Sequence, residues 1–324
     1  MTSKRTAAFQ RNPRLEALLG RLNEAIADVT FPAQETPPLP PLFILGTPRS
    51  GTTYCMQWLA ASGAFSYPSN LIARFWRTPA IGAVCQQMLT DPTYDFRGEF
   101  ADVSFSGLEN RSELGKTQGL LSPNEFWYFW RSIFPGDGDI GIDLTQATGP
   151  QFSAFTEKLQ DFAAVRAKPV VTKGMIVNHQ VTAFAKGLPN ALFIHLDRDP
   201  YASAWSLLQA RERMHGERSI WYSFKTPNQA DLQTLPAPQQ VMGQIDTIRR
   251  DLKAQLSELP QDRWLSIDYS ALCQDPDGAF DRIRSLFAGQ GVELSGQNCL
   301  PPARVSRPDI PSDVAAAFDA YLGN

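Results

Sequence analysis

One stretch near the N-terminus constrains the fold more than any other, Pro41-Leu-Phe-Ile-Leu-Gly-Thr-Pro-Arg-Ser-Gly-Thr-Thr-Tyr-Cys-Met56. Residues 42–45 form a short apolar run, which is typical of a buried parallel strand. Gly46 ends this run, residues 47–51 form a tight loop, and residues 52–62 are predicted to be a helix. The loop N–H groups and the positive end of the helix dipole point to one place. The stretch therefore predicts an anion-binding site.

Charge and composition limit the kind of partner. The chain has 324 residues, of which 43% are apolar, enough for one large α/β domain or two small ones. Its 30 basic and 33 acidic residues give a net charge of −3. This balance argues against nucleic acid or an acidic membrane as the partner, so an anion site must be built from a few local cations and helix ends.

Cysteine usage and hydropathy predict a cytoplasmic protein without a membrane span. The first ten residues lack the apolar core of a signal peptide, and no run of 18 apolar residues occurs. The four cysteines are far apart and form no C-x-x-C pair, which fits a reduced compartment and disfavours a cysteine zinc site. They are Cys55, Cys85, Cys273 and Cys299.

The order of elements predicts an α/β fold with a central, mainly parallel sheet flanked by helices. Residues 1–41 are expected to hold an N-terminal helix and a connector with five prolines, and residues 42–324 a single domain. Segments 66–135 and 216–238 are expected to be variable acceptor or lid regions. The predicted strands are 42–45, 168–172, 191–196 and 264–267. The predicted helices include 12–29, 52–62, 78–89, 151–166, 178–186, 199–214 and 239–259.

An aromatic run follows a predicted helix start. In Ser122-Pro-Asn-Glu125, the serine suits the N-cap, the proline the first helical position, and Glu125 the third. Residues 126–130 are all aromatic, so they would cover every face of that helix and not all can be core. Together with residues 221–224, they are predicted either to pack in the core or to line an apolar acceptor pocket.

Three cations each follow the end of a predicted strand. They are Arg49, Lys173 and Arg198. Ligands of open α/β sheets bind outside the carboxyl ends of the strands. We therefore expect these cations to converge on one rim.

The first loop is close to a phosphate-binding P-loop but differs from one. Gly46 and Gly51 have the P-loop spacing, yet Thr52 and Thr53 stand where Lys and Ser/Thr should follow. The cation has moved to Arg49, and no clear acidic metal partner follows a strand. Phosphoryl transfer normally needs Mg²⁺, whereas a sulfuryl group carries less charge, so we expect no metal. The alternative is a glycine-rich turn with a surface arginine.

A second phosphate-binding site is predicted around Arg198. Asp199 can cap the following helix, Pro200 suits its first position, and Ser203 and Ser206 share one face. Arg198 and a helix serine can hold a phosphate through charge-assisted hydrogen bonds. An Arg-Asp-Pro helix start that serves only as a surface cap is the alternative.

These motifs resemble those of the sulfotransferases that use 3′-phosphoadenosine 5′-phosphosulfate (PAPS). The segment around Arg49 resembles their 5′-phosphosulfate loop. Ile194-His-Leu-Asp-Arg198-Asp-Pro, with Ser206 eight residues after the arginine, resembles their 3′-phosphate motif. The segment 264–287, with Tyr269-Ser-Ala-Leu and Asp275-Pro, resembles their late strand and helix.

The resemblance implies a P-loop NTPase-like sulfotransferase fold of the bacterial type. It implies PAPS as donor, adenosine 3′,5′-bisphosphate (PAP) as product, and transfer to a hydroxyl group, with an amine as the less favoured acceptor. The acceptor would be a small molecule, lipid or glycan. Arg49 would stabilise the leaving phosphate. The implied 5′-phosphate ligands are Ser50, Gly51, Thr52 and Thr53, and the implied 3′-phosphate ligands are Arg198 and Ser206.

The chain departs from the cytosolic small-molecule branch of that family. The basic glycine-rich segment near the C-terminus is missing, and Arg304 and Arg307 are the basic candidates to replace it. The histidine base after the second strand is also missing, because that strand ends Thr172-Lys173-Gly174.

Several residues remain open as the base that takes the acceptor proton. His179 is the best-placed histidine and Glu125 is comparable, whereas Lys173 fits an electrostatic role better. We expect His195 to be a packed residue within a strand and His215 to be a helix cap. Glu109 and Glu113 are weaker candidates.

Two other functions compete with a metal-independent sulfotransferase. A P-loop kinase of small molecules would use ATP and Mg²⁺, and it should carry a lysine after Gly51. A nucleotide-binding protein without chemistry would suit the lack of an obvious base. The sequence does not predict the oligomeric state.

Overall fold

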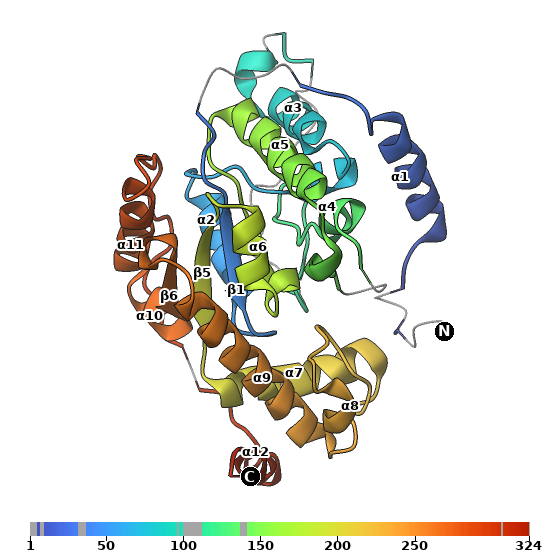
Figure 1. Ribbon diagram of the computed structural model, residues 1–324, viewed down its shortest axis with the longest axis vertical. Helices are drawn as coiled ribbons and strands as arrows, with labels where there is room; N and C mark the ends of the chain where they lie inside the picture. The colour runs from blue at the N-terminus through green and yellow to red at the C-terminus, as the bar shows by residue number, and fades with distance from the viewer. Residues whose placement is uncertain are drawn as a thin grey trace.

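The centre of the molecule is a four-stranded, fully parallel sheet with the strand order β4-β1-β5-β6 (Figure 1). The computed structural model describes residues 5–6, 10–31, 37–95, 97–99, 112–136, 141–305 and 307–323. The strands are β1 (Leu42–Gly46), β4 (Val171–Lys173), β5 (Leu192–Asp197) and β6 (Trp264–Asp268). All four predicted strands and the α/β class are confirmed.

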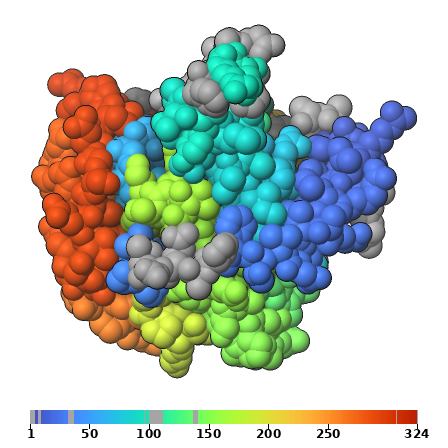
Figure 2. All heavy atoms as spheres, turned by 90° about the horizontal axis from the view of Figure 1, so that it is seen from above, coloured from blue at the N-terminus to red at the C-terminus, as the bar shows by residue number. Residues whose placement is uncertain are grey.

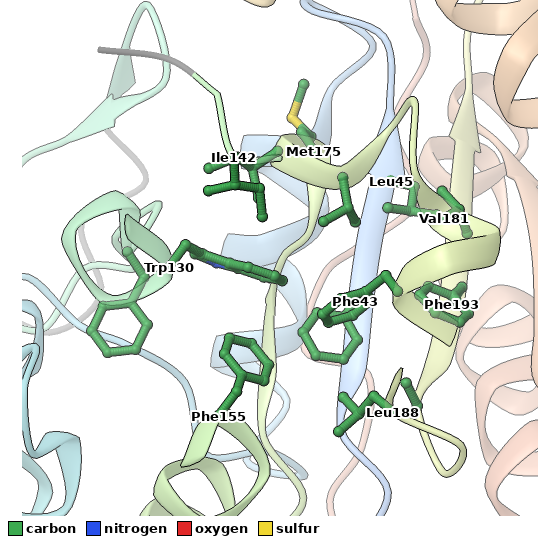
Figure 3. Close-up of a cluster of buried hydrophobic side chains, with 14 of the residues drawn as sticks. Phe43, Leu45, Trp130, Ile142, Phe155, Met175, Val181, Leu188 and Phe193 are labelled. Carbon is green, nitrogen blue, oxygen red and sulfur yellow. The ribbon is translucent and has the colours of Figure 1, made fainter. Parts of the chain in front are cut away.

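Side chains of β1 alternate between the two faces of the sheet, as the pleat of a strand requires. Leu42 and Ile44 pack in a cluster with α2 and α11, and Phe43 and Leu45 pack in the opposite cluster. That second cluster is drawn in Figure 3, where Phe43 lies among Trp130, Phe155 and Phe193. The helices that contribute to the two layers are α2 (Thr52–Ala61), α4 (Trp127–Ile133), α5 (Gly149–Arg166), α6 (Val181–Gly187), α9 (Ala237–Ser257) and α11 (Pro276–Ala288).

The long helix α9 joins the sheet to a separate helical layer. Ile248, Leu252 and Leu256 of α9 belong to the core over Phe43, whereas Val241 and Ile245 pack in a third cluster. This third cluster holds α7 and α12 against the N-terminal half of α9, below the sheet in Figure 1. The helices of this layer are α7 (Pro200–His215), α8 (Gln229–Leu232) and α12 (Ser312–Leu322).

The remaining elements surround this core. In the space-filling view, α1 and α11 lie on opposite sides, with α3 and α5 between them (Figure 2). No helix of the described ranges is long and apolar enough to cross a membrane. The further elements are α1 (Pro13–Ala25), α3 (Pro79–Thr90), α10 (Tyr269–Gln274), the hairpin β2 (Ser112–Glu113) and β3 (Lys116–Thr117), and the 3-10 turns η2 (Ile72–Phe75), η3 (Pro92–Tyr94), η4 (Leu144–Gln146), η5 (Met175–Val177) and η6 (Gln261–Arg263).

The predicted helix start at Ser122 is wrong. The helix α4 begins at Trp127, because Phe126 adopts a left-handed conformation with φ 61°. The Asn124 side chain accepts a hydrogen bond from the Phe126 N–H at 2.9 Å and so stabilises the turn before the helix. Glu125 therefore lies in a loop outside the helix.

Residues 126–130, the aromatic run, are only in part core residues, as five consecutive positions at a helix start require. Phe126, Phe129 and Trp130 are buried in the core over Phe43. Trp127 and Tyr128 are only partly buried. Five consecutive aromatics thus supply three core residues and leave Trp127 and Tyr128 for other contacts.

Replacing Asp275 by alanine is expected to lower the free energy of unfolding by about 1 kcal/mol. The Asp275 side chain caps α11 by accepting a hydrogen bond from the Gly278 N–H at 2.9 Å. Chemical denaturation measures the loss. Asp281→Ala in the same helix is the matched control, because Asp281 is exposed and forms a surface ion pair with Arg284 three residues away. Equal losses in the two variants would contradict a capping role.

Candidate functional site

The loop of residues 47–51, predicted to bind an anion, lies at the point where the sheet topology reverses. The chain leaves β1 toward β4 on one side, and it leaves β5 toward β6 on the other. The carboxyl ends of β1 and β5 therefore open between two connections that diverge, which is the usual ligand site of such sheets. Gly46 ends β1 here, and Arg198 follows the last residue of β5.

The backbone of the loop is held in an uncommon conformation. Arg49 has φ 67°, in the left-handed region that a residue with a side chain rarely adopts. Gly51 has φ 98°, and a Cβ atom there would lie 2.4 Å from Cδ2 of Tyr269, so only glycine fits. The N-terminus of α2 begins directly after it, at Thr52. The loop is thus compact and opens onto a helix N-terminus, as an anion cradle requires.

Arg49, Arg198 and Ser206 meet at this loop. The Arg49 Nε donates a hydrogen bond to Ser206 Oγ at 3.0 Å, and an Arg198 guanidinium N–H donates to the backbone carbonyl of Arg49 at 2.9 Å. Burial lowers the pKa of the Arg49 guanidinium, and the adjacent Arg198 charge lowers it as well. Two like charges held together at a partly buried site favour binding of an anion.

Lys173, Thr53 and Glu125 form a second group beside the loop. Lys173 is buried at the end of β4, and its Nζ donates to Thr53 Oγ1 at 2.7 Å and to Glu125 Oε1 at 2.9 Å. The other carboxylate oxygen of Glu125 accepts a hydrogen bond from the Trp127 indole N–H at 2.6 Å. Residues from three distant segments are therefore brought to one point next to the N-terminus of α2.

In the loop and in α7, two buried hydroxyl groups have no hydrogen-bond partner within the described part of the chain. They are Ser50 Oγ in the loop and Ser203 Oγ in the first turns of α7. A buried hydroxyl without a partner costs free energy, so each such group needs a ligand or an ordered water as its partner. Their place beside Arg49 and Arg198 fits a site for phosphate groups.

Tyr269 also lies at this site. It belongs to the segment 264–287 of the sequence, but no function was predicted for it. Its ring packs against Gly51, and the Arg198 guanidinium lies 4.8 Å from the ring centroid. Burial raises the pKa of the Tyr269 hydroxyl to about 12, so it stays neutral at physiological pH. It immediately follows β6, so the strand-end rule that identified Arg49, Lys173 and Arg198 could have found it.

The hairpin β2–β3 also reaches the site. Leu114 and Gly115 form its turn with φ 50° and 88°, and a Cβ atom on Gly115 would lie 3.1 Å from Glu125 Oε1. The Tyr222 hydroxyl donates to the Leu114 carbonyl at 3.2 Å and so holds this turn. A strand of two residues has no periodicity to reveal it, which is why the sequence did not predict the hairpin.

The histidines have separate surroundings. His179 precedes α6, and its Nδ1 lies 2.6 Å from a carboxylate oxygen of Asp251. His195 is buried in β5, 3.3 Å from Ser266 Oγ, and burial lowers its pKa. His215 ends α7 and stacks edge-on against Tyr222.

The hydrogen bonds of the site do not include the other sequence candidates that lie in the described residues. Glu113 is exposed in β2, and Glu109 lies outside the described residues. Arg304 and Arg307 are exposed between α11 and α12. The Ala303 N–H donates to the Cys273 carbonyl at 2.7 Å, which places this segment next to α10, the helix that begins with Tyr269.

Comparison with known proteins identifies the family. Solved structures with a similar fold include sulfotransferase STF9 from Mycobacterium avium, with 16% identity over 95% of this chain and 72% of that one and a TM-score of 0.49. STF1 from Mycobacterium tuberculosis H37Rv shows 15% identity over 95% and 76%, with a TM-score of 0.48. No curated protein sequence matches the chain. The model of the sulfotransferase family matches residues 40–289, well over half of the sequence, and the chain therefore belongs to that family.

Proposed function

We propose that this protein transfers a sulfuryl group from PAPS to a hydroxyl group of a small acceptor, with an amine as the less favoured acceptor. One observation carries the proposal: Arg49, Arg198 and Ser206 meet at the topological switch point, next to the Lys173–Glu125 pair. This arrangement combines cations for two phosphates with a carboxylate that can accept a proton. The four cysteines are free in the structure, in keeping with the cytoplasmic location that we propose.

The residues of the loop fit a donor with two phosphate groups. The N–H groups of residues 50–53 at the start of α2 would hold the 5′-phosphate, and the unpartnered Ser50 hydroxyl adds a donor. Arg198 and Ser206 would hold the 3′-phosphate. Arg304 and Arg307 are proposed as further cations for this side of the nucleotide.

Glu125 is our choice of base. In-line transfer bonds the acceptor oxygen to sulfur, breaks the bond from sulfur to the bridging oxygen, and releases the acceptor proton. Glu125 would take this proton, because its carboxylate is fixed by Lys173 and Trp127 beside the loop. Arg49 and Lys173 would offset the charge left on the 5′-phosphate.

The contact between Lys173 and Thr53 disfavours the kinase alternative. A P-loop kinase uses the hydroxyl at the position of Thr53 to bind Mg²⁺. Here an ammonium group donates a hydrogen bond to that oxygen at 2.7 Å. A divalent cation at the same oxygen would meet the positive charge of Lys173 at close range.

Thermal stabilisation by nucleotides tests the proposed function. PAP at 100 times its dissociation constant should stabilise the protein by ~2.7 kcal/mol, whereas ATP with Mg²⁺ should give a smaller shift. Differential scanning calorimetry with each ligand measures this. Stabilisation only by ATP and Mg²⁺ would reject the proposal. Stabilisation by PAP without formation of PAP from PAPS in a broad acceptor screen would favour a binding protein.

A further inference from the structure

We propose that Gln244, held by the buried Arg211, positions the Glu125 carboxylate through the segment 221–224. The inference rests on the proposed function, in which Glu125 takes the acceptor proton, and it adds two positioning residues to that site. Arg211 belongs to α7 and Gln244 to α9, two helices that pack against each other in the helical layer (Figure 1). Both side chains are buried there, so they act on the carboxylate only through other residues.

Arg211 is an unusual residue for the interior of a helical layer. It is 0% exposed, and burial lowers the pKa of its guanidinium to about 10. Its hydrogen bonds within the described residues go to neutral oxygens, Gln240 Oε1 at 2.8 Å, Gln244 Oε1 at 3.2 Å and the Arg218 carbonyl at 3.4 Å. Burying a charge beside neutral partners costs free energy, so packing alone does not account for a guanidinium at this place.

Gln244 connects Arg211 to the segment 221–224. Because its Oε1 accepts a hydrogen bond from Arg211, the orientation of the amide is fixed and its Nε2 remains as a donor. This Nε2 donates to the Tyr222 carbonyl at 3.1 Å and to the Phe224 carbonyl at 2.7 Å. The two helices thus fix the backbone of a segment that has no helix or strand of its own.

The segment needs this support because its backbone is strained. Ser223 has φ 73°, in the left-handed region that a residue with a side chain rarely adopts, and it lies between the two carbonyls that Gln244 holds. The Arg211 guanidinium lies 5.0 Å from the centroid of the Trp221 ring, and the Trp221 indole N–H donates to the Phe224 carbonyl at 3.2 Å. Such conformations persist where the surrounding contacts fix them, and they concentrate at functional sites.

Two side chains of the segment contact the surroundings of Glu125. The Tyr222 hydroxyl donates to the Leu114 carbonyl of the hairpin turn at 3.2 Å, and a Cβ atom on the next residue would lie 3.1 Å from Glu125 Oε1. Phe224 packs on Trp127 with ring centroids 5.3 Å apart, and the Trp127 indole N–H donates to Glu125 Oε2 at 2.6 Å. Both the hairpin turn and Trp127 therefore depend on the segment 221–224 for their place beside the carboxylate.

Two matched substitutions on α9 test the inference. Gln244→Glu and Gln240→Glu each give the Arg211 guanidinium a carboxylate in place of an amide oxygen, so both variants are expected to fold. Only Gln244→Glu removes the donor to the segment 221–224, because Gln240 Nε2 donates to the Leu235 carbonyl instead. Gln240→Glu is therefore a control with the same change of charge at the same guanidinium.

The first measurement is the Trp127 indole N–H signal in a proton–nitrogen correlation spectrum, assigned by its loss in Trp127→Phe. It should shift in Gln244→Glu and stay in place in Gln240→Glu. The second measurement is PAP formation from PAPS with the acceptor found in the screen. Gln244→Glu should lower kcat about tenfold, less than the ~10²-fold cost of a 1 Å misplacement, and leave the KM for PAPS within about twofold. Gln240→Glu should keep the wild-type kcat.

The outcomes separate this inference from the proposed function. If the indole signal or kcat responds equally to the two variants on α9, the inference is wrong and the donor site stands. A higher KM for PAPS at unchanged kcat would overturn it as well. A thermal melt verifies folding; if Gln244→Glu does not fold, Tyr222→Phe tests the link to the hairpin turn, and an unchanged kcat there overturns the inference. If PAP does not bind the wild type, the proposed function itself fails, whatever the indole signal does.

Discussion

Replacing Arg49 by alanine is expected to lower kcat by about 10²–10³-fold, the usual cost of losing one preorganised donor to a developing charge. The guanidinium is held by Ser206 through Nε, and Arg198 fixes its backbone carbonyl. It therefore needs no reorganisation when charge develops on the leaving phosphate. The rate of PAP release at saturating acceptor and donor measures the effect.

Two further substitutions sharpen this prediction. Arg49→Lys should recover part of the rate, because the charge returns without the flat guanidinium that Ser206 holds. Arg250→Ala should leave kcat unchanged, since Arg250 is exposed on α9 and forms a surface ion pair with Asp246. Each variant should melt close to the wild type. Normal turnover by Arg49→Ala would show that the loop does not serve the leaving group.

Replacing Glu125 by glutamine is expected to lower kcat by about 10²–10⁴-fold, the range for loss of a general base. The amide keeps the shape of the side chain but cannot take a proton from the acceptor. PAP binding should stay the same, because in the proposed function Glu125 contacts the acceptor and not the nucleotide. Single-turnover rates and a PAP titration measure the two effects separately.

The Glu125 variant also changes hydrogen bonding, so it needs its own control. Lys173 and Trp127 both donate to the carboxylate, and an amide can accept only one of these bonds with its oxygen. Trp127→Phe removes the same indole bond and leaves the carboxylate intact. If Trp127→Phe lowers kcat as much as Glu125→Gln, the effect is positional and Glu125 is not the base.

The parts of the site that follow strands could be predicted from the sequence. Arg49, Lys173 and Arg198 each follow a strand of the parallel sheet, and all parallel strands end on one edge. The resemblance to the sulfotransferase 3′-phosphate motif implied that Arg198 and Ser206 act together, and the structure brings both to Arg49. Strand direction was enough for Arg49, Lys173 and Arg198, whereas Ser206 was identified through the family resemblance.

Residues outside the strands could not be placed in this way. Glu125 was expected in the first turn of a helix, but the left-handed Phe126 moves the helix start to Trp127. A single backbone conformation thus decides whether the carboxylate points along a helix or toward Lys173. The Nδ1 atom of His179 contacts Asp251, which lies 72 residues away in the sequence. No local sequence pattern therefore predicts this pair.

The sequence by itself determined the parallel sheet, the tight loop after β1 and the family, because short-range patterns specify strands, turns and helix starts. Only the tertiary structure decided that Lys173 holds Glu125 beside Thr53, and that Gln244 holds the segment 221–224, which packs on Trp127. These contacts join segments far apart in the chain. Their geometry depends on how α4, α6 and α9 pack over the sheet, which residue patterns do not encode locally.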